Sequence, residues 1–269
     1  MTPPFNTLLL TGAAGILGQV LAPTLQALTT RLRVSDLPAA LAQARLPFGI
    51  EAAPCDLTDG AAVHALLHGV NAVVHLGGIS VEGPFEPILQ ANIRGLHNLY
   101  EAARRQGARR IVFASSNHVT GCYAQAHSIT PQDPPRPDGN YGLSKLFGEG
   151  IASLSGDRFG IESVCLRIGT ATPVPPDRRG LATWISLPDL ARLVTASLTA
   201  PGVGFLVAYG MSANTRAFWR TDEAWAKLGY VPLDDAEQPA ASVQHLLQPA
   251  GPMRDLQGGA FLGRGPYDD

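Results

Sequence analysis

The sequence predicts an α/β fold, built on a doubly wound parallel sheet and completed by a small irregular C-terminal portion. Short apolar runs typical of buried strands alternate along the chain with longer segments of helical periodicity, which is the pattern of parallel sheets. The first of these runs also leads into a glycine-rich turn, Gly12-Ala-Ala-Gly15-Ile-Leu-Gly18, and then into a helix.

Strand, turn and helix together form the first unit. The run 7–11 is the strand, and the helical pattern after the turn extends to Leu28. Such a turn lets the backbone approach a pyrophosphate, and the helix N-terminus offers free N–H groups to the phosphates. The spacing is Gly-x-x-Gly-x-x-Gly, whereas the general pattern of Rossmann-type folds is Gly-x-Gly-x-x-Gly. We expect five residues of this turn to bind a dinucleotide: Gly12, Gly15, Ile16, Leu17 and Gly18.

The second strand, 31–35, ends at Asp36, about 20 residues beyond the turn. A carboxylate at this point accepts hydrogen bonds from the ribose hydroxyls of the adenosine, and it repels the additional phosphate of NADP. The neighbouring Leu37 adds no cation that would offset the repulsion. The sequence therefore predicts NAD as the cofactor.

The remaining strands and helices follow in alternation. Further strands are expected at 49–55, 71–76, 110–114, 163–168 and 204–208. Helices are expected at 61–68 and 86–106, followed by the helix that carries Tyr141. Ligands gather at the carboxyl ends of strands in such sheets. We expect further cofactor contacts from Asp56, Leu57, Leu76, Gly77, Gly78 and Asn92.

No internal repeat or low-complexity linker divides the chain. We therefore expect a single domain over residues 1–269. A NAD-binding core should extend over about 5–168, and a C-terminal portion over about 169–269 should cover the substrate site.

Composition limits the partners and the compartment. Hydrophobic residues make up 45% of the 269, enough for a sizeable core, and a formal net charge of −2 gives no reason to expect nucleic acid. We find no signal-peptide pattern and no apolar run long enough for a membrane span, so we expect no membrane partner. The three cysteines are few and widely spaced, which favours free thiols in a reducing cytoplasm. His64 and His68 have metal-ligand spacing, but no acidic residue adjoins His64 and we expect no metal.

Tyr141 and Lys145 carry the expected chemistry. Their four-residue spacing puts both side chains on one face of a helix. An ammonium near a phenol favours the phenolate, and bringing a phenol pKa from about 10 towards 7 requires about 4 kcal/mol of differential stabilisation. We expect one lysine in a partly desolvated site, together with the positive charge of an oxidised nicotinamide, to supply it. We predict that Tyr141 is a general base and that Lys145 lowers its pKa and binds the nicotinamide ribose. Ser116, after the 110–114 strand, is predicted to hydrogen-bond the reacting hydroxyl.

The glycine turn, Asp36, Ser116 and the Tyr141-x-x-x-Lys145 pair together resemble the extended short-chain dehydrogenase/reductase superfamily, over most of the chain. Within it, four stretches are similar to those of the uronate dehydrogenases: 75–82, 113–118, 166–169 and 256–261. The resemblance implies NAD-dependent oxidation of the anomeric carbon of a hexuronate, galacturonate or glucuronate, to an aldarolactone. Only about 100 residues follow Ile168, which leaves little material for the nucleotide clamp of sugar-nucleotide epimerases.

The resemblance also implies how the substrate is held. A carboxylate matches the planar fork of arginine, and Arg179 is the expected partner, whereas Arg178 is expected to be solvated. His118 is expected to bind a hydroxyl, since Tyr141 already provides the base. Thr170 stands where the family has serine, which keeps the hydroxyl and adds a methyl group. The full set of expected substrate contacts is Ser80, Ser116, Asn117, His118, Tyr141, Thr170, Arg179 and Phe261.

Other functions stay open at this point. A nucleotide-sugar epimerase or a neutral-aldose dehydrogenase would use the same core, and an epimerase would release no net NADH. A non-catalytic NAD-sensing regulator is a third class, although such proteins commonly lose the tyrosine or the lysine that this chain retains. Superfamily members often assemble through paired helices, so we expect a homo-oligomer. The sequence leaves the preferred uronate, its anomer and the lactone ring size open.

Overall fold

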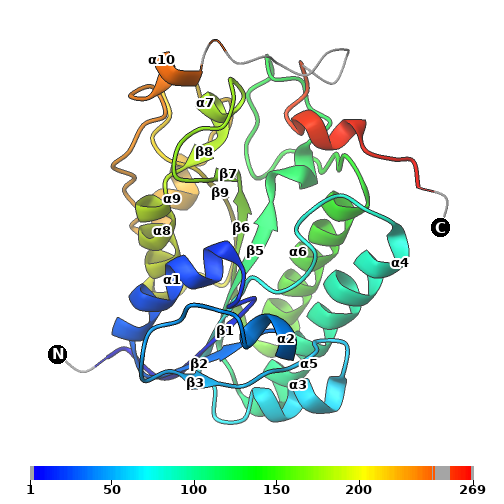
Figure 1. Ribbon diagram of the computed structural model, residues 1–269, viewed down its shortest axis with the longest axis vertical. Coiled ribbons are helices and arrows are strands. Elements are labelled where there is room, and N and C mark those ends of the chain that lie inside the picture. The colour runs from blue at the N-terminus through cyan, green and yellow to red at the C-terminus, as the bar shows by residue number, and fades with distance from the viewer. Residues whose placement is uncertain (1–2, 244, 246–254, 268–269) are drawn as a thin grey trace.

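The computed structural model describes residues 3–243, 245 and 255–267. Its centre is a seven-stranded sheet of order β3-β2-β1-β4-β5-β6-β9, in which every neighbouring pair is parallel (Figure 1). The strands are β1 (Phe5–Thr11), β2 (Thr29–Ser35), β3 (Glu51–Ala52), β4 (Ala72–His75), β5 (Arg110–Ser116), β6 (Glu162–Ile168) and β9 (Phe205–Gly210). The Rossmann-type parallel sheet that the sequence predicts is thereby confirmed.

Helices cover both faces of the sheet. One layer contains α1 (Ile16–Ala27), α8 (Leu187–Thr199) and α9 (Asp222–Leu228), and the other contains α3 (Gly60–Leu66), α5 (Gly95–Gln106) and α6 (Asn140–Phe159). The strand β1 shows why both faces are covered. Successive side chains of a strand point to opposite faces of the sheet, and those of β1 are apolar on both. Leu8 and Leu10 are fully buried in the core under α1 and α8, whereas Leu9 is fully buried in the core under α3, α5 and α6.

The third strand is shorter than the expected 49–55. Only Glu51–Ala52 pairs with β2 as a ladder. Gly49 has a left-handed φ of +83°, and Pro54 has no N–H to donate. The N–H groups of Ala53 and Cys55 still reach carbonyls of the β2 edge, at 2.9 and 3.0 Å, so the segment follows β2 in irregular form.

The expected helix at 86–106 consists of three pieces. It begins as α4 (Phe85–Ile88), widens into the π-helix η1 (Leu89–Arg94), and continues as α5. A π-turn inserts an extra residue into the helix and is often found at functional sites. Here it contains the buried Asn92, whose contacts are described below.

The smaller elements lie mostly at the carboxyl edge of the sheet. They are α2 (Pro38–Leu41), the 3₁₀-helix η2 (Asn117–Thr120), β7 (Thr170–Ala171) paired with β8 (Trp184–Ile185), α7 (Gly180–Thr183), α10 (Ala240–Val243) and the 3₁₀-helix η4 (Gly259–Gly263). In the described part of the chain, no helix combines the length and apolarity that crossing a membrane requires.

Part of the C-terminal portion is built into the sheet. β9 pairs with β6, and α8 packs beside α1. Asp189, at the start of α8, is fully buried and accepts hydrogen bonds from Ser212 Oγ at 2.6 Å, Leu233 N at 2.9 Å and Asp234 N at 3.0 Å. Because these bonds tie α8 to the segment beyond β9, we propose that the chain forms one domain, with no independent unit beginning near residue 169.

Candidate active site

Two glycine turns meet where β1 and β4 end. Gly12 has a φ of +70°, and a Cβ there would lie 2.6 Å from the carbonyl carbon of Leu76 and 2.7 Å from the nitrogen of Gly77. A Cβ on Gly18 would likewise run into the backbone of Gly12. Only glycine permits this backbone-to-backbone packing. Ile16, in the first turn of α1, is 76% exposed, so this end of the helix is open to a ligand.

Asp36 lies against the first glycine turn. Its Oδ2 accepts a hydrogen bond from Ala14 N at 2.9 Å, and its Oδ1 accepts one from Leu37 N at 2.8 Å. Backbone donors therefore fix the carboxylate beside the turn, next to the exposed side chain of Leu37. An anion and an apolar side chain in this place fit the ribose of NAD and oppose the additional phosphate of NADP.

The second glycine turn is held by Asn92. The Asn92 side chain accepts a hydrogen bond from Ile79 N at 2.8 Å, and donates to Ile79 O at 3.0 Å and to Ser144 Oγ at 2.9 Å. Its amide is thus occupied by protein groups. These bonds fix the loop after β4 to α6. Leu57 lies on the same side, since a Cβ on Gly77 would come within 2.9 Å of Leu57 Cδ1.

Two of the expected contact residues lie at the exposed edge of this region. Asp56 is exposed, and its Oδ1 accepts hydrogen bonds from Thr58 N at 2.9 Å and Thr58 Oγ1 at 2.8 Å. Ser80 is also exposed, directly after the residue that Asn92 holds. Both are accessible to ligands, but neither is joined to the buried cluster described next.

Tyr141, Lys145 and Ser116 come together between α6 and the end of β5. All three are buried. Lys145 Nζ donates a hydrogen bond to Ala114 O at 2.8 Å and lies 5.5 Å from the centroid of the Tyr141 ring. The four-residue spacing thus places the ammonium beside the phenol, as the sequence predicts.

The protein groups around Tyr141 raise the pKa of its phenol. Burial raises the pKa of Tyr141 to about 12, a hydrogen bond with Ser116 lowers it, and the negative charge of Asp138 raises it. Burial also lowers the pKa of Lys145 to about 8, because the interior disfavours the ammonium. The side chains of the protein therefore leave the phenol protonated at neutral pH.

Glu82 fixes the start of α6, a role that sequence reasoning missed. Its side chain is buried, and the carboxylate accepts hydrogen bonds from Asn140 N at 3.0 Å and Tyr141 N at 2.9 Å. A carboxylate on the first N–H groups of a helix also suits the helix dipole. Glu82 lies 59 residues before Tyr141, and nothing in the local sequence signals this pairing.

Glu149 fixes the middle of α6. It is buried, accepts a hydrogen bond from Ser115 Oγ at 2.7 Å, and forms a bidentate pair with Arg167 in which both nitrogen–oxygen distances are 2.9 Å. These bonds join α6 to β5 and β6. The sequence spacing could have revealed this residue. Glu149 follows Tyr141 by eight residues and Lys145 by four, so it lies on the same face of the helix.

Arg179 reaches the same end of the sheet. Its Nε donates a hydrogen bond to Gln257 O at 2.5 Å, and its Nη1 donates to Thr170 Oγ1 at 3.4 Å. In the amide orientation that satisfies both of its ends, Asn117 accepts from Arg179 Nη2 at 2.7 Å. Among the described residues no carboxylate forms an ion pair with this half-buried guanidinium, and burial lowers its pKa. The neighbouring Arg178 is exposed, as expected.

His118 and Phe261 complete the cluster. Their rings are stacked, with centroids 4.0 Å apart and planes at 13°. The ring of Tyr141 lies edge-on to both, with its centroid 5.7 Å from that of His118 and 6.0 Å from that of Phe261. Apart from Ser80, the expected substrate contacts therefore form one contiguous group. Sequence reasoning missed Asp138, which binds His118, and Gln257, which binds Arg179.

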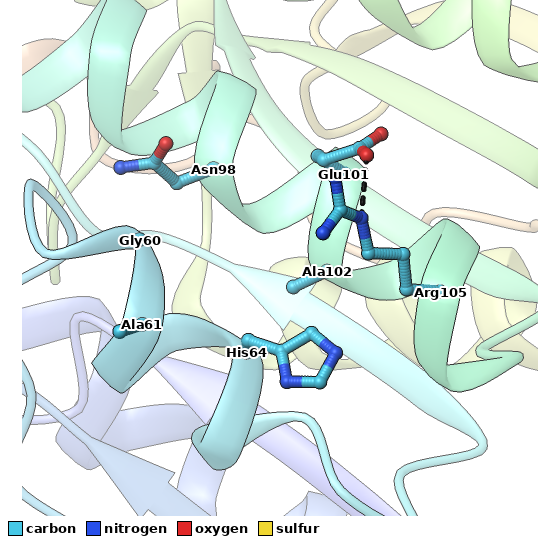
Figure 2. A pocket seen from close by; sticks show the side chains of 7 residues that line it. All are labelled: Gly60, Ala61, His64, Asn98, Glu101, Ala102 and Arg105. Atoms are coloured by element: carbon cyan, nitrogen blue, oxygen red, sulfur yellow. Dashed lines mark hydrogen bonds and ion pairs between the residues drawn. The ribbon is translucent and has the colours of Figure 1, made fainter.

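A separate hollow lies between α3 and α5 (Figure 2). It is lined by Gly60, Ala61, His64, Asn98, Glu101, Ala102 and Arg105. Its charged groups satisfy one another, because Glu101 pairs with Arg104 at 2.8 Å and with Arg105 at 2.6 Å. His64 contacts the exposed amide of Gln106. Within the described ranges, no group of three or more His, Cys, Asp or Glu residues has the arrangement of a metal site.

Comparisons with known proteins agree with this geometry. Residues 8–175 match the model of the NAD dependent epimerase/dehydratase family. The uronate dehydrogenase of Pseudomonas syringae pv. tomato is 50% identical over 268 residues, which cover 99% of this chain and 96% of that protein. The uronate dehydrogenase of Agrobacterium fabrum is 45% identical over 258 residues, or 95% and 96% of the two chains. One similar solved structure is the crystal structure of a uronate dehydrogenase variant from Agrobacterium tumefaciens, complexed with NAD. Its sequence is 43% identical, the match covers 98% of this chain and 100% of that one, and the TM-score is 0.91. The chain belongs to the NAD-dependent epimerase/dehydratase family.

Proposed function

We propose that the protein catalyses the uronate dehydrogenase reaction: oxidation of the anomeric carbon of a hexuronate, galacturonate or glucuronate, to an aldarolactone with NAD. The observation that carries this proposal is Arg179. Its half-buried guanidinium forms no ion pair with a carboxylate of the described residues, although the charges of Asp177 and Asp138 raise its pKa, and it shares the end of the sheet with Tyr141 and Ser116. A planar fork in such surroundings matches the carboxylate of a sugar acid. The activity named for the relatives at 45% and 50% identity supports it.

Tyr141 is the proposed general base. As a phenolate, it accepts the proton of the anomeric hydroxyl, while Ser116 hydrogen-bonds the same hydroxyl and fixes its direction. NAD, when bound, supplies the hydride acceptor and a positive charge beside the phenol. The anomeric carbon becomes the carbonyl carbon of a lactone. The new lactone carbonyl is neutral, so the site requires no oxyanion hole of the acyl-transfer kind.

The cofactor is proposed to lie along the two glycine turns. The glycine turn at 12–18 receives the diphosphate, Asp36 the adenosine ribose, and Lys145 the nicotinamide ribose. The open end of α1 and the carboxylate fixed beside it support this arrangement. The other residues proposed to border the cofactor are Asp56, Leu57, Leu76, Gly77, Gly78, Asn92 and Tyr141.

A homo-oligomer is proposed to form through one face of α6. Leu143, Phe147 and Leu154 recur at helical spacing on this face and are 47%, 36% and 52% exposed, and Phe85 of the adjacent α4 is 41% exposed. The two helices lie side by side at one edge of the molecule (Figure 1). A second copy of the chain presenting the same face would cover these side chains.

A reducing compartment, the cytoplasm, is the proposed location. Cys55, Cys122 and Cys165 are all free, as is common in proteins of such compartments.

With NAD, we expect galacturonate and glucuronate to yield NADH, and galactose and glucose to yield little. Arg179→Ala should lower kcat/KM for the uronates about a hundredfold, because the carboxylate loses a charge-assisted pair. Arg178→Ala, the exposed neighbour, is the matched control and should change kcat/KM little. Equal turnover of the neutral sugars would indicate an aldose dehydrogenase. Conversion of nucleotide sugars without NADH formation would indicate an epimerase.

The rate should rise with pH. Since Tyr141 acts as a phenolate and burial raises its pKa, kcat/KM at saturating NAD should increase about tenfold per pH unit on the acid side of the profile. Tyr141→Phe should lose about 10²- to 10⁴-fold in rate together with this dependence. Lys145→Met should move the acid limb to higher pH. A pH-rate profile unchanged in Tyr141→Phe would assign the base to another group.

Asp36→Ala should weaken discrimination between the two cofactors. Loss of the carboxylate removes hydrogen bonds to the ribose and the repulsion of a phosphate, so the ratio of kcat/KM for NAD to that for NADP should fall at least about tenfold. Steady-state kinetics with each cofactor measure this ratio. Asp56→Ala removes an exposed carboxylate at the adenine side and should leave the ratio unchanged. If both variants lowered it equally, Asp36 would not be the discriminating residue.

Leu154→Glu should shift the protein towards smaller assemblies, because a charge in an apolar interface is costly to bury. Light scattering coupled to size-exclusion chromatography reports the mass. Val231→Glu is the control, since Val231 is 67% exposed and lies outside this face. A monomeric parent protein would contradict the proposal.

A further inference from the structure

We infer that Asp138 is a positioning residue, which fixes the tautomer of His118 so that His118 Nε2 accepts a hydrogen bond from a hydroxyl of the substrate. The inference rests on the proposed function for the identity of the substrate.

Asp138 occupies a junction of three distant segments. Its side chain is 1% exposed, and it stands at the end of the loop before α6. Gly121, after η2, and Gly258, in the C-terminal segment, lie so close that a Cβ on either would collide with the carboxylate. Glycine at both positions therefore leaves the space that the buried Asp138 carboxylate occupies.

The carboxylate has a single side-chain partner among the described residues. Its Oδ2 lies 2.7 Å from His118 Nδ1, and its Oδ1 is buried without a hydrogen-bond partner. An ionised carboxylate only accepts hydrogen bonds, so Nδ1 must carry the proton. The neighbouring backbone reinforces this placement, because Asp138 N donates to His118 O at 3.3 Å.

A neutral imidazole with its proton on Nδ1 has an acceptor at Nε2. No described residue hydrogen-bonds to His118 Nε2, although the side chain is only 9% exposed. The ring plane is fixed as well, by the stacked Phe261 on one side and by the edge-on Tyr141. Nε2 is therefore an oriented acceptor in the cluster that contains Arg179, and a sugar hydroxyl is the donor it suits.

Asp138 does not serve the proton transfer itself. Its negative charge raises the pKa of Tyr141, which disfavours the phenolate. The same charge raises the pKa of the Arg179 guanidinium, and the one side-chain hydrogen bond of the carboxylate among the described residues orients His118.

The test is Asp138→Asn, which keeps the shape of the side chain. The amide lacks the negative charge that holds the proton on Nδ1, and its NH₂ facing Nδ1 moves the proton to Nε2 and turns the acceptor into a donor. We expect kcat/KM for the hexuronate to fall about 10- to 100-fold, as for loss of one hydrogen bond to a buried group, with KM for NAD unchanged. Nitrogen-15 NMR of histidine-labelled protein should show the change of tautomer at His118.

Two controls isolate the effect. Asp133→Asn alters a carboxylate of the same loop that, within the described residues, accepts hydrogen bonds from Thr130 at 2.7 Å, and it should leave the kinetics unchanged. In the His118→Asn background, Asp138→Asn should cause no further loss, because non-additivity marks residues that act through one another. Additive losses, or an unchanged tautomer, would overturn the inference. If the parent protein oxidised no uronate, the proposed function would fail, whereas the NMR result would still decide the role of Asp138.

Discussion

The ion pair between Glu149 and Arg167 is the contact on which the active site depends. Both side chains are buried, and the pair joins α6 to β6 while Ser115 Oγ adds β5. Burying two charges is costly, and removing one partner of such a pair typically costs about 3–5 kcal/mol. The bidentate geometry and the bond from Ser115 offset that cost. As a result, the helix that carries Tyr141 and Lys145 has one register against the strand that ends at Ser116.

Close packing at the same interface requires glycines within the helix. A Cβ on Gly148 would meet the ring of Phe113, and one on Gly142 would meet the carbonyl of His118. Each glycine in a helix interior weakens the helix by about 1 kcal/mol relative to alanine. α6 therefore owes its stability to tertiary contacts such as those of Glu82 and Glu149 more than to its intrinsic propensity. The same close approach brings Lys145 Nζ to the carbonyl of Ala114.

The parts of the structure that local patterns encode could be predicted from the sequence. Apolar runs gave the strands, and the spacing of Tyr141 and Lys145 gave one helix face, since both signals depend on residues within a few positions. The contacts of Asp138 and Gln257 could not be found in this way. Gln257 is fully buried and binds the carbonyl of Ala124, 133 residues earlier, and no periodicity marks such a pairing. The contact of Asn92 with Ser144, 52 residues later, could not be predicted for the same reason.

The protonation states of Tyr141 and Lys145 connect the architecture to the proposed chemistry. Burial raises the pKa of the Tyr141 phenol to about 12 and lowers the pKa of the Lys145 amine to about 8. Both shifts oppose the proposed catalysis, which needs a phenolate beside an ammonium. One pKa unit corresponds to about 1.4 kcal/mol, so a phenol that works near neutral pH needs several kcal/mol of further stabilisation of its anion. Ser116 contributes a hydrogen bond, but Asp138 acts in the opposite direction. We propose that the ammonium of Lys145 and the positive charge of oxidised NAD would supply the remaining stabilisation. Tyr141 would then become an effective base only with the cofactor present, which couples removal of the proton to the availability of a hydride acceptor.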